Sequence, residues 1–298
     1  MDPKSERMIF SPRSVPLDMI KEPDTVENHI VIDYTDTIGE GSFSVVRLAK
    51  NQKEDKIYAV KIIDKSKLDQ KSLELIANET EILKMIDHPN VLKFHFAEED
   101  VRFVHIFTEY YRAGDVSELL NRRFNSRFRG FRSDQIYVIF SQMVKAVEYL
   151  HSMGIIHRDV KLENFLYDNM TDLNVVIADF GFAMKPTDPL IEDYAGSPPY
   201  AAPEIVKGVP NEGYPSDLWS LGVCLYTMET GDYPFYSLNR SQMYEMIVSG
   251  LFNEKLIKDS DMLQLIKGLL TTEIEHRYTF EDIYQSAWWK KKSEATGR

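Results

Sequence analysis

Cysteine is almost absent from this sequence: Cys224 is the single thiol among 298 residues. One cysteine cannot form an internal disulfide, and it cannot build the cysteine-rich sites that hold structural zinc. Because disulfides accumulate in oxidising compartments, their exclusion favours a reducing compartment. Cys224 also stands in the apolar run Leu221–Tyr226, which indicates a buried packing role. We therefore expect a cytoplasmic or nuclear location.

Positive charge and long apolar runs are scarce as well. Lys and Arg number 35 against 47 Asp and Glu, which gives a net charge of −12 at pH 7. This balance argues against an electrostatic grip on nucleic acid or on anionic membranes. No apolar run approaches the roughly 20 residues of a membrane helix, and the polar segment Met1–Arg7 does not resemble a signal peptide. We expect no membrane or nucleic-acid partner and a monomeric state.

The order of the sequence patterns predicts two lobes. Residues 1–33 carry four prolines among polar residues and no sustained period, which indicates a flexible extension. The strand-like and helical runs that follow are Val45–Ala49, Ile57–Ile63, 70–86, Val91–Phe96 and Arg102–Glu109. After Asp115 the pattern is mainly helical, most clearly over 134–152. Strands first and helices later predict an N-lobe over 34–110, a C-lobe over 111–289 and a tail over 290–298.

The first chemical signal is a pair of glycines near a strand turn, in Gly39–Val46 (GEGSFSVV). Glycine lets backbone N–H groups approach a phosphate closely, although a glycine pair is more often only a turn. Lys61 follows within an apolar strand. An inward-facing lysine there needs an anion, either a phosphate or a carboxylate such as Glu79 or Glu81. The alternative is an edge lysine that reaches water.

The second signal lies in the C-terminal half. His157–Asn164 (HRDVKLEN) collects a carboxylate, two cations and an amide on a loop. Asp179 directly follows the apolar strand Val175–Ala178. A carboxylate and an amide are hard-oxygen ligands that suit Mg²⁺ on phosphates. A solvated turn is the alternative interpretation of the loop.

Taken together, these motifs resemble the eukaryotic protein kinases. Ala202–Glu204, Asp217–Gly222 and Arg277 fit the later parts of that pattern, so the resemblance covers residues 34–289. Lys161 and the segment Gly196–Glu204 are similar to serine/threonine kinases of the calcium/calmodulin-dependent and AMP-activated group. The resemblance implies an α+β fold, with a small antiparallel-sheet N-lobe that carries one key helix and a mainly helical C-lobe. It also implies ATP-dependent phosphorylation of protein serine and threonine hydroxyls.

The resemblance also implies roles for the catalytic residues. Asp159 would be the catalytic base, and Lys161 would offset charge on the transferring phosphoryl group. Asn164 and Asp179 would hold Mg²⁺ on ATP. Lys61 would contact the α- and β-phosphates and pair with Glu79 rather than with Glu81.

The ATP site follows from the same resemblance. Its residues would be Ile38, Gly39, Glu40, Gly41, Ser42, Phe43, Ser44, Val45, Val46, Ala59, Lys61, Glu109, Tyr111, Asp115, Leu166 and Asp179. Backbone groups of Glu109 and Tyr111 would bond adenine, and Asp115 would reach the ribose. Thr108 occupies the gatekeeper position, and its small size predicts a back pocket open to bulky inhibitors.

Regulation and substrate choice can be predicted in outline. Asp193 aligns with the activating phosphothreonine of related kinases, where its charge could pair with Arg158, although it could also be one more acidic residue in a polar loop. Partial activity without an upstream kinase is the corresponding expectation. Glu163 and Asp115 match carboxylates that read a basic residue three positions before the target serine or threonine. Thr227 stands where relatives that read position −2 carry a glutamate.

Two alternatives stay open. The arginines Arg122, Arg123, Arg127, Arg129 and Arg132 interleave with phenylalanines, a pattern that can bind RNA or phosphorylated partners. An enlarged loop between two helices with solvated charges is the favoured interpretation.

The alternative function is a pseudokinase or scaffold that binds ATP and partners without transfer. The presence of Lys61, Asp159, Asn164 and Asp179 favours the active enzyme.

Overall fold

The computed structural model describes residues 30–35, 37–40, 44–123, 130–169, 173–186, 190–191 and 195–296. The chain divides into two compact units. The first comprises residues up to Asp69 together with His95–Tyr110, and the second comprises Gln70–Phe94 and the chain from Tyr111 onward. One division thus falls after Tyr110, where the sequence predicts a boundary between lobes. Residues 70–94 group with the second unit.

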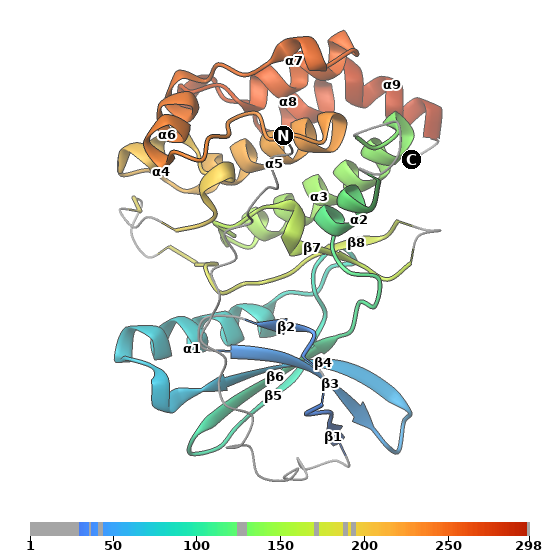
Figure 1. Ribbon diagram of the computed structural model, residues 1–298, viewed down its shortest axis with the longest axis vertical. Coiled ribbons are helices and arrows are strands. Elements are labelled where there is room, and N and C mark those ends of the chain that lie inside the picture. Colours follow the sequence, from blue (N-terminus) through green and yellow to red (C-terminus); the bar gives the residue numbers. More distant parts are fainter. Residues whose placement is uncertain are drawn as a thin grey trace, which may run out of the picture. The chain divides into compact units, whose positions relative to one another are not determined.

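The first unit is built on an antiparallel sheet (Figure 1). Its elements are β1 (Ile30–Ile32), β2 (Gly39–Glu40), β3 (Ser44–Asn51), β4 (Lys56–Asp64), η2 (Lys65–Lys67), β5 (Phe94–Glu99) and β6 (Phe103–Glu109). The strand order is β1-β3-β4-β6-β5, and β2 pairs with β3. The hairpin that the sequence predicts between residues 45 and 63 is β3–β4. Strand β1 begins inside the range 1–33 that the sequence assigns to an extension.

Alternation along β4 separates the two faces of the sheet. Tyr58, Val60 and Ile62 are buried and join Ile30 and Phe107 in one apolar cluster. Successive side chains of a strand point to opposite faces, so the intervening residues of β4 face away from this cluster. The sheet therefore has one face committed to the core and one left for other contacts.

The second unit is mainly helical. Its helices are α1 (Gln70–Met85), α2 (Val116–Arg123), α3 (Ser133–Ser152), α4 (Pro203–Lys207), α5 (Tyr214–Thr230), α6 (Arg240–Ser249), α7 (Ser260–Leu269), α8 (Phe280–Gln285) and α9 (Ala287–Thr296). The shorter elements are η3 (Leu162–Asn164), β7 (Phe165–Tyr167), β8 (Val175–Ile177), η4 (Pro198–Tyr200), η5 (Glu254–Leu256) and η6 (Ile274–His276). No helix among the residues that the structure describes combines the length and the apolar character of a membrane span.

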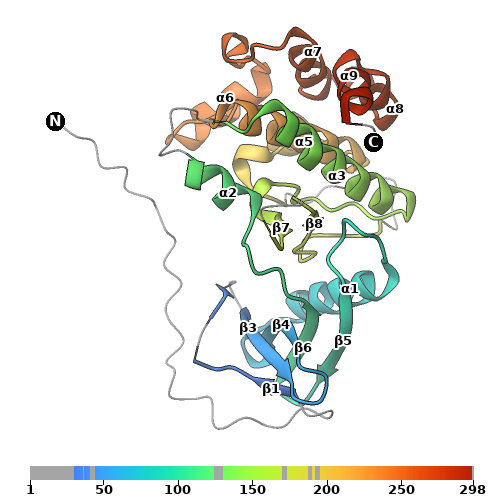
Figure 2. The ribbon, with the colours of Figure 1, turned by 90° about the vertical axis from the view of Figure 1, so that its right-hand side faces the viewer.

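Helices α3 and α5 run side by side in the centre of this unit (Figures 1 and 2). The apolar stripe predicted over 134–152 is buried on α3, with Ile136, Ile139 and Phe140 at 0% exposure. Pro215 lies in the first turn of α5, where its missing N–H is not needed, and Gly231 ends the helix with a left-handed φ of 79°. Helix α5 is buried along almost its whole length.

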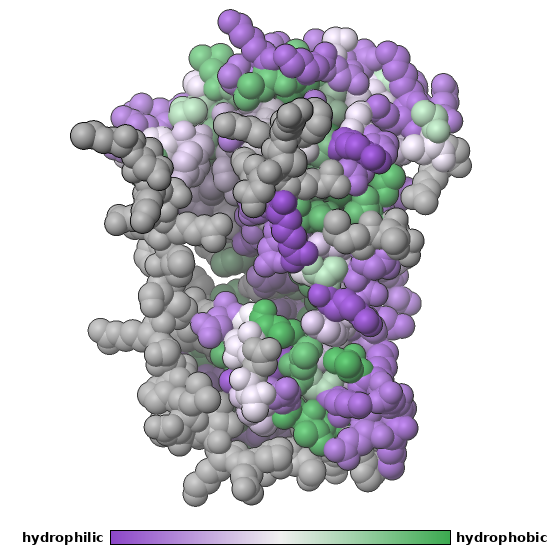
Figure 3. Space-filling view, turned by 45° about the vertical axis from the view of Figure 1, so that its right-hand side comes forward, coloured by the Kyte–Doolittle hydropathy of each residue, from purple (hydrophilic) through white to green (hydrophobic). Residues whose placement is uncertain are grey.

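Two local predictions need correction. The strand predicted to begin at Val91 begins at Phe94, because the backbone before it is used elsewhere: Leu92 N–H donates to Ile177 at 2.9 Å. The arginine-rich stretch is not all loop, because Arg122 lies on α2 and its guanidinium bonds Glu118 one helical turn away at 3.2 Å. Arg127 and Arg129 lie outside the described residues. On the face seen in Figure 3, hydrophobic side chains form separate groups among hydrophilic ones.

Candidate active site

In the first unit, the sheet register places Val46, Ala59 and Lys61 on one face, whereas Val45, also predicted to bind ATP, pairs with Ile62 and packs against the core cluster on the other face. Val46 pairs with Lys61 across β3–β4, and Ala59 pairs with Thr108 across β4–β6. Directly opposed residues of antiparallel strands share a face. Lys61 also pairs with Ile106, so a half-buried lysine stands among apolar neighbours on the face away from the core cluster.

The glycine-containing turn is described in part. Gly39 pairs with Val46, Glu40 pairs with Val45, and the side chain of Ile38 is exposed. Ser44 begins β3. The predicted phosphate-loop residues Gly41, Ser42 and Phe43 lie outside the described residues.

Glu109, predicted to bond adenine through its backbone, ends β6, and its side chain is held within the first unit. Its Oε2 lies 2.7 Å from His95 Nε2 and 3.2 Å from Lys56 Nζ. Burial by itself would raise the pKa of Glu109, but the hydrogen bonds from His95 and Lys56 lower it overall. The side chain of Glu109 is thus held by two residues of its own unit.

In the second unit, a short backbone bridge joins two further predicted residues. Asp115 bridges Leu166 in antiparallel fashion. Asp115 Oδ1 accepts the N–H of Glu118 at 2.8 Å, so this carboxylate also caps the start of α2. Burial raises the pKa of Asp115 to about 6, and the charges of Glu118 and Glu163 add to the rise.

Asp217 on α5 fixes the loop His157–Asn164, which holds the predicted catalytic base and is called the catalytic loop below. It accepts the backbone N–H groups of His157 and Arg158, both at 2.9 Å, and lies 2.9 Å from the ring nitrogen of His151. Arg158 adopts a left-handed φ of 67°, which costs energy in any residue with a side chain. Burial by itself would raise the pKa of Asp217, but these partners lower it overall. A buried carboxylate thus stabilises a strained loop.

Asp159 lies next in this loop and is 3% exposed. Lys161 Nζ lies 2.6 Å from its Oδ2, and Asn164 Nδ2 donates to the same oxygen at 3.0 Å. Its other oxygen, Oδ1, is buried and has no hydrogen-bond partner among the residues that the structure describes. A buried carboxylate oxygen without a partner is costly unless a ligand supplies one. Asp159 therefore has one oxygen fixed by Lys161 and Asn164 and a second oxygen that can accept a further hydrogen bond.

The two predicted metal ligands, Asn164 and Asp179, lie close to Asp159 in the chain or in the fold, since Ala178 N–H donates to the Asn164 carbonyl at 2.8 Å. Asn164 uses its amide nitrogen on Asp159, which leaves its amide oxygen for another partner. Asp179 is exposed at the end of the strand region and adopts a left-handed φ of 60°. Phe180 is buried, and its ring meets the ring of His157 edge-on at 5.1 Å. Burial lowers the pKa of His157, so this ring stays neutral at pH 7.

Helix α1 lies beside this motif within the same unit. Glu79 is 5% exposed, and a side chain at Gly181 would come 3.9 Å from its Oε2. Asn78 Nδ2 donates to the carbonyl of Ala183 at 2.8 Å. Glu81 is exposed and pairs with Lys84, as expected for a solvated helix residue.

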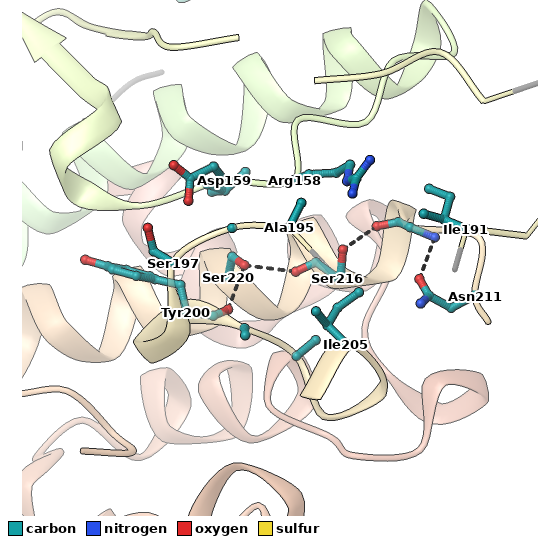
Figure 4. Close-up of a pocket in the computed structure, with 15 residues that line it drawn as sticks. Arg158, Asp159, Ile191, Ala195, Ser197, Tyr200, Ile205, Asn211, Ser216 and Ser220 are labelled. Atoms are coloured by element: carbon teal, nitrogen blue, oxygen red, sulfur yellow. Dashed lines mark hydrogen bonds between the residues drawn. The ribbon is translucent and has the colours of Figure 1, made fainter. Parts of the chain in front are cut away.

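A pocket opens beside Asp159, between the catalytic loop and the start of α5 (Figure 4). Figure 4 shows Asp159, Ser197 and Tyr200 toward one end, with Ile191 and Asn211 at the other. Lys161 Nζ donates to Ser197 Oγ at 2.9 Å, which joins the residue directly before η4 to the catalytic loop. Asp193, the predicted regulatory residue, lies outside the described residues.

The predicted substrate-reading residue Glu163 is bonded by two tyrosines. Tyr200 OH donates to Oε2 at 3.0 Å, and Tyr233 OH donates to Oε1 at 3.3 Å. Thr227 is buried and its hydroxyl donates to the carbonyl of Val223, one helical turn back. The side chain of Thr227 is thus used within its own helix.

A buried ion pair joins Arg277, near the C-terminal end of the second unit, to Glu204 on α4. Arg277 makes a bidentate contact with Glu204, at 2.6 and 2.8 Å. Both side chains are almost fully buried. The planar guanidinium matches the carboxylate geometry, which is the arrangement in which buried pairs are strongest.

This combination of an antiparallel-sheet unit and a helical unit with an aspartate-centred loop defines the protein kinase class. Residues 32–289 match the family described as "Protein kinase domain", and the chain belongs to that family. The predicted α+β kinase fold is thereby confirmed, and the relatives described next confirm the resemblance to serine/threonine kinases.

The curated relatives of this chain are serine/threonine-protein kinases. The chain is 36% identical over 258 residues to serine/threonine-protein kinase SIK1 of Rattus norvegicus, which covers 86% of this chain and 32% of the relative. The same identity relates it to SIK2 of Gallus gallus, over 86% of this chain and 31% of the relative. A SIK3 homolog of Danio rerio is 35% identical over 86% of this chain and 21% of its own length. The chain thus spans about a third or less of these relatives.

Sequence reasoning missed several residues of the site. The motif Asp217–Gly222 does not by itself give Asp217 a role, although a carboxylate inside an apolar helix indicates that it accepts hydrogen bonds from buried donors. Asn78 and Tyr233 gave no signal, because the partners that define their roles are distant in sequence.

Proposed function

We propose that this chain transfers the γ-phosphoryl group of ATP to serine or threonine hydroxyls of protein substrates. The observation that carries the proposal is the vacant buried Oδ1 of Asp159. A substrate hydroxyl that donates to this oxygen would satisfy it and would be oriented for attack on the phosphorus. Lys161, already bonded to the other oxygen, supplies positive charge where the transferring group needs it.

ATP and Mg²⁺ belong to the same proposal. Asn164 and Asp179 would supply two oxygen ligands, and Mg²⁺ commonly takes the rest from phosphates and water. The amide oxygen of Asn164, whose amide nitrogen bonds Asp159, and the exposed carboxylate of Asp179 fit this requirement. Lys61 would contribute phosphate contacts from the first unit. Bound Mg²⁺ would neutralise charge that develops on the phosphates.

Two variants test the transferase directly. Asp159→Asn and Lys61→Met should each abolish phosphorylation of a generic serine/threonine peptide, measured by ³²P transfer, while circular dichroism shows a folded protein. The matched control is Lys84→Met, an exposed lysine of α1 whose partner is Glu81. Wild-type protein that binds ATP and transfers to no peptide would establish the alternative, a scaffold.

Substrate choice is proposed to follow Glu163 and Asp115. The charge of Glu163 helps to raise the pKa of Asp115, so the two carboxylates lie close enough to repel each other. A basic residue three positions before the target would relieve that repulsion. A positional-scanning peptide library should show Arg or Lys preferred at −3 and no preference at −2. A stronger preference at −2 would contradict the assignment.

Activity without an upstream kinase is also proposed. Asp193 would supply a single negative charge beside Arg158, whereas phosphothreonine supplies about −1.5 to −2. Bacterially expressed protein treated with phosphatase should therefore retain partial activity. Protein that is inert until residues 182–200 are phosphorylated would refute the idea.

A further inference from the structure

We propose that Tyr233 is a positioning residue for substrate recognition, which holds the Glu163 carboxylate so that it selects arginine over lysine at position −3. The inference deepens the proposed substrate preference and rests on it. It assigns a role to a residue outside the catalytic loop, in the segment between α5 and α6.

The geometry fixes the carboxylate from two sides. Tyr233 and Tyr200 donate to different oxygens of Glu163, at 3.3 and 3.0 Å. Each carboxylate oxygen offers two lone-pair directions, so one direction on each oxygen stays open. With both oxygens bonded, the plane of the carboxylate cannot rotate freely about the last side-chain bond.

The Tyr233 ring is itself held in place. It meets the ring of Tyr200 edge-on at 5.5 Å and stacks on Tyr236 at 6.0 Å with an interplanar angle of 25°. Burial raises the pKa of Tyr233 well above its usual value, and the charge of Glu163 adds to the rise. The phenol therefore stays protonated and remains a donor over the whole physiological range.

A fixed carboxylate favours arginine for a geometric reason. The guanidinium group offers two parallel N–H donors in a rigid plane, and both can bond only if the carboxylate presents its oxygens in that plane. Lysine is a compact charge with rotatable donors, so it gains little from the orientation of its partner. Removing the Tyr233 hydroxyl should thus weaken arginine recognition selectively.

The experiment compares Tyr233→Phe with wild type on three peptides that carry Arg, Lys or Ala at −3. The KM for the Arg peptide should rise about fivefold, the scale of one lost hydrogen bond of ordinary strength. The KM values for the Lys and Ala peptides, the kcat and the KM for ATP should stay within about twofold of wild type. Tyr284→Phe is the matched control, because Tyr284 OH donates to another glutamate, Glu148, between α8 and α3.

A double-mutant cycle with Glu163→Gln tests whether Tyr233 acts through the Glu163 carboxylate. Tyr233→Phe should change nothing further in the Glu163→Gln background, because the carboxylate that it positions is gone. Additive effects, or an equal rise in KM for all three peptides, would show a merely structural role and overturn the proposal.

Failure of the wider proposals gives different results. An active wild type with equal KM for the three peptides overturns both the −3 preference and the role of Tyr233. If no peptide is phosphorylated, the transferase proposal fails, and dissociation constants of the same peptides from fluorescence anisotropy are compared instead. A fivefold loss of affinity confined to the Arg peptide then supports Tyr233, and an unchanged Arg-to-Lys ratio overturns it.

Discussion

Replacing Asp217 by alanine removes the acceptor of two backbone N–H groups and of His151. These donors would stay buried without partners, which should lower the free energy of unfolding by about 3 kcal/mol. Urea unfolding followed by circular dichroism measures the change. Asp134→Ala, which breaks an exposed pair with Arg132, should cost less than about 1 kcal/mol. Equal losses in the two variants would contradict the role given to Asp217.

We predict that Asp115 makes both stability and peptide recognition depend on pH. Its pKa of about 6 lies above the ordinary 3.8, chiefly because the carboxyl is buried. The folded protein binds this proton more tightly than the unfolded chain, so the free energy of unfolding falls as the pH rises from about 4 to about 6. Recognition runs the other way: the KM for an Arg(−3) peptide should fall as the pH rises through about 6.

The control for this profile is the same peptide with Ala at −3. Its KM should show no step near pH 6, because no cation then faces the carboxylate. Asp115→Asn should flatten the profile of the arginine peptide. A step that survives in Asp115→Asn would assign the titration to another group.

For single residues, the sequence predicted those site residues that lie close together in the chain. Asp159, Lys161 and Asn164 stand within six residues, and the structure brings their polar groups together. The bonds of Glu163 to Tyr233 could not be predicted, because they join residues 70 positions apart. Such partners are set by the packing of α5 against the catalytic loop, which no local pattern records.

At the scale of elements, a backbone bridge to Asn211 anchors Ile191, and both residues line the pocket beside Asp159. Ile191 N–H donates to the Asn211 carbonyl at 2.7 Å, and Asn211 N–H returns a bond at 3.2 Å. A side chain at Gly213 would come 2.7 Å from Ile191 and 2.8 Å from Ile156. Gly213→Ala should therefore displace this anchor and lower kcat/KM for peptides by roughly tenfold, since a crowded core shifts its neighbours.

Gly208→Ala is the matched comparison for that variant. Gly208 has a similar positive φ of 65°, but nothing lies within 4 Å of an added side chain. Both variants should lose about 1 kcal/mol of stability from the left-handed backbone. Only Gly213→Ala should lose activity in a peptide kinase assay, and equal activities would argue against the anchor.

Helices and strands were predicted correctly where the apolar periodicity is strong. They were predicted wrongly where the backbone forms hydrogen bonds outside the expected strand. The stripe over 134–152 became α3 almost unchanged, because its apolar residues bury against α5. The strand expected at Val91 starts at Phe94, since Leu92 donates to Ile177 instead. Arg122 looked like loop by composition, yet it lies on α2 and bonds Glu118.

At the scale of the whole molecule, Arg277 and Glu204 join parts of the chain that are 73 residues apart. Arg277→Met would leave Glu204 buried and unpaired, which should lower the free energy of unfolding by about 3 to 5 kcal/mol. The loss should appear as a lower midpoint in urea. Lys267→Met, which breaks a half-exposed pair with Glu254, should have little effect.

The strained backbone at Arg158 has a consequence for the order of folding. Its left-handed φ of 67° is held by an acceptor 59 residues further along the chain, on α5. Contacts of such sequence separation form late, because the intervening chain must first be ordered. In refolding from urea, helical circular dichroism should therefore return before phosphotransferase activity. Catalytic competence would then be the last property that the molecule acquires, after its helices are already in place.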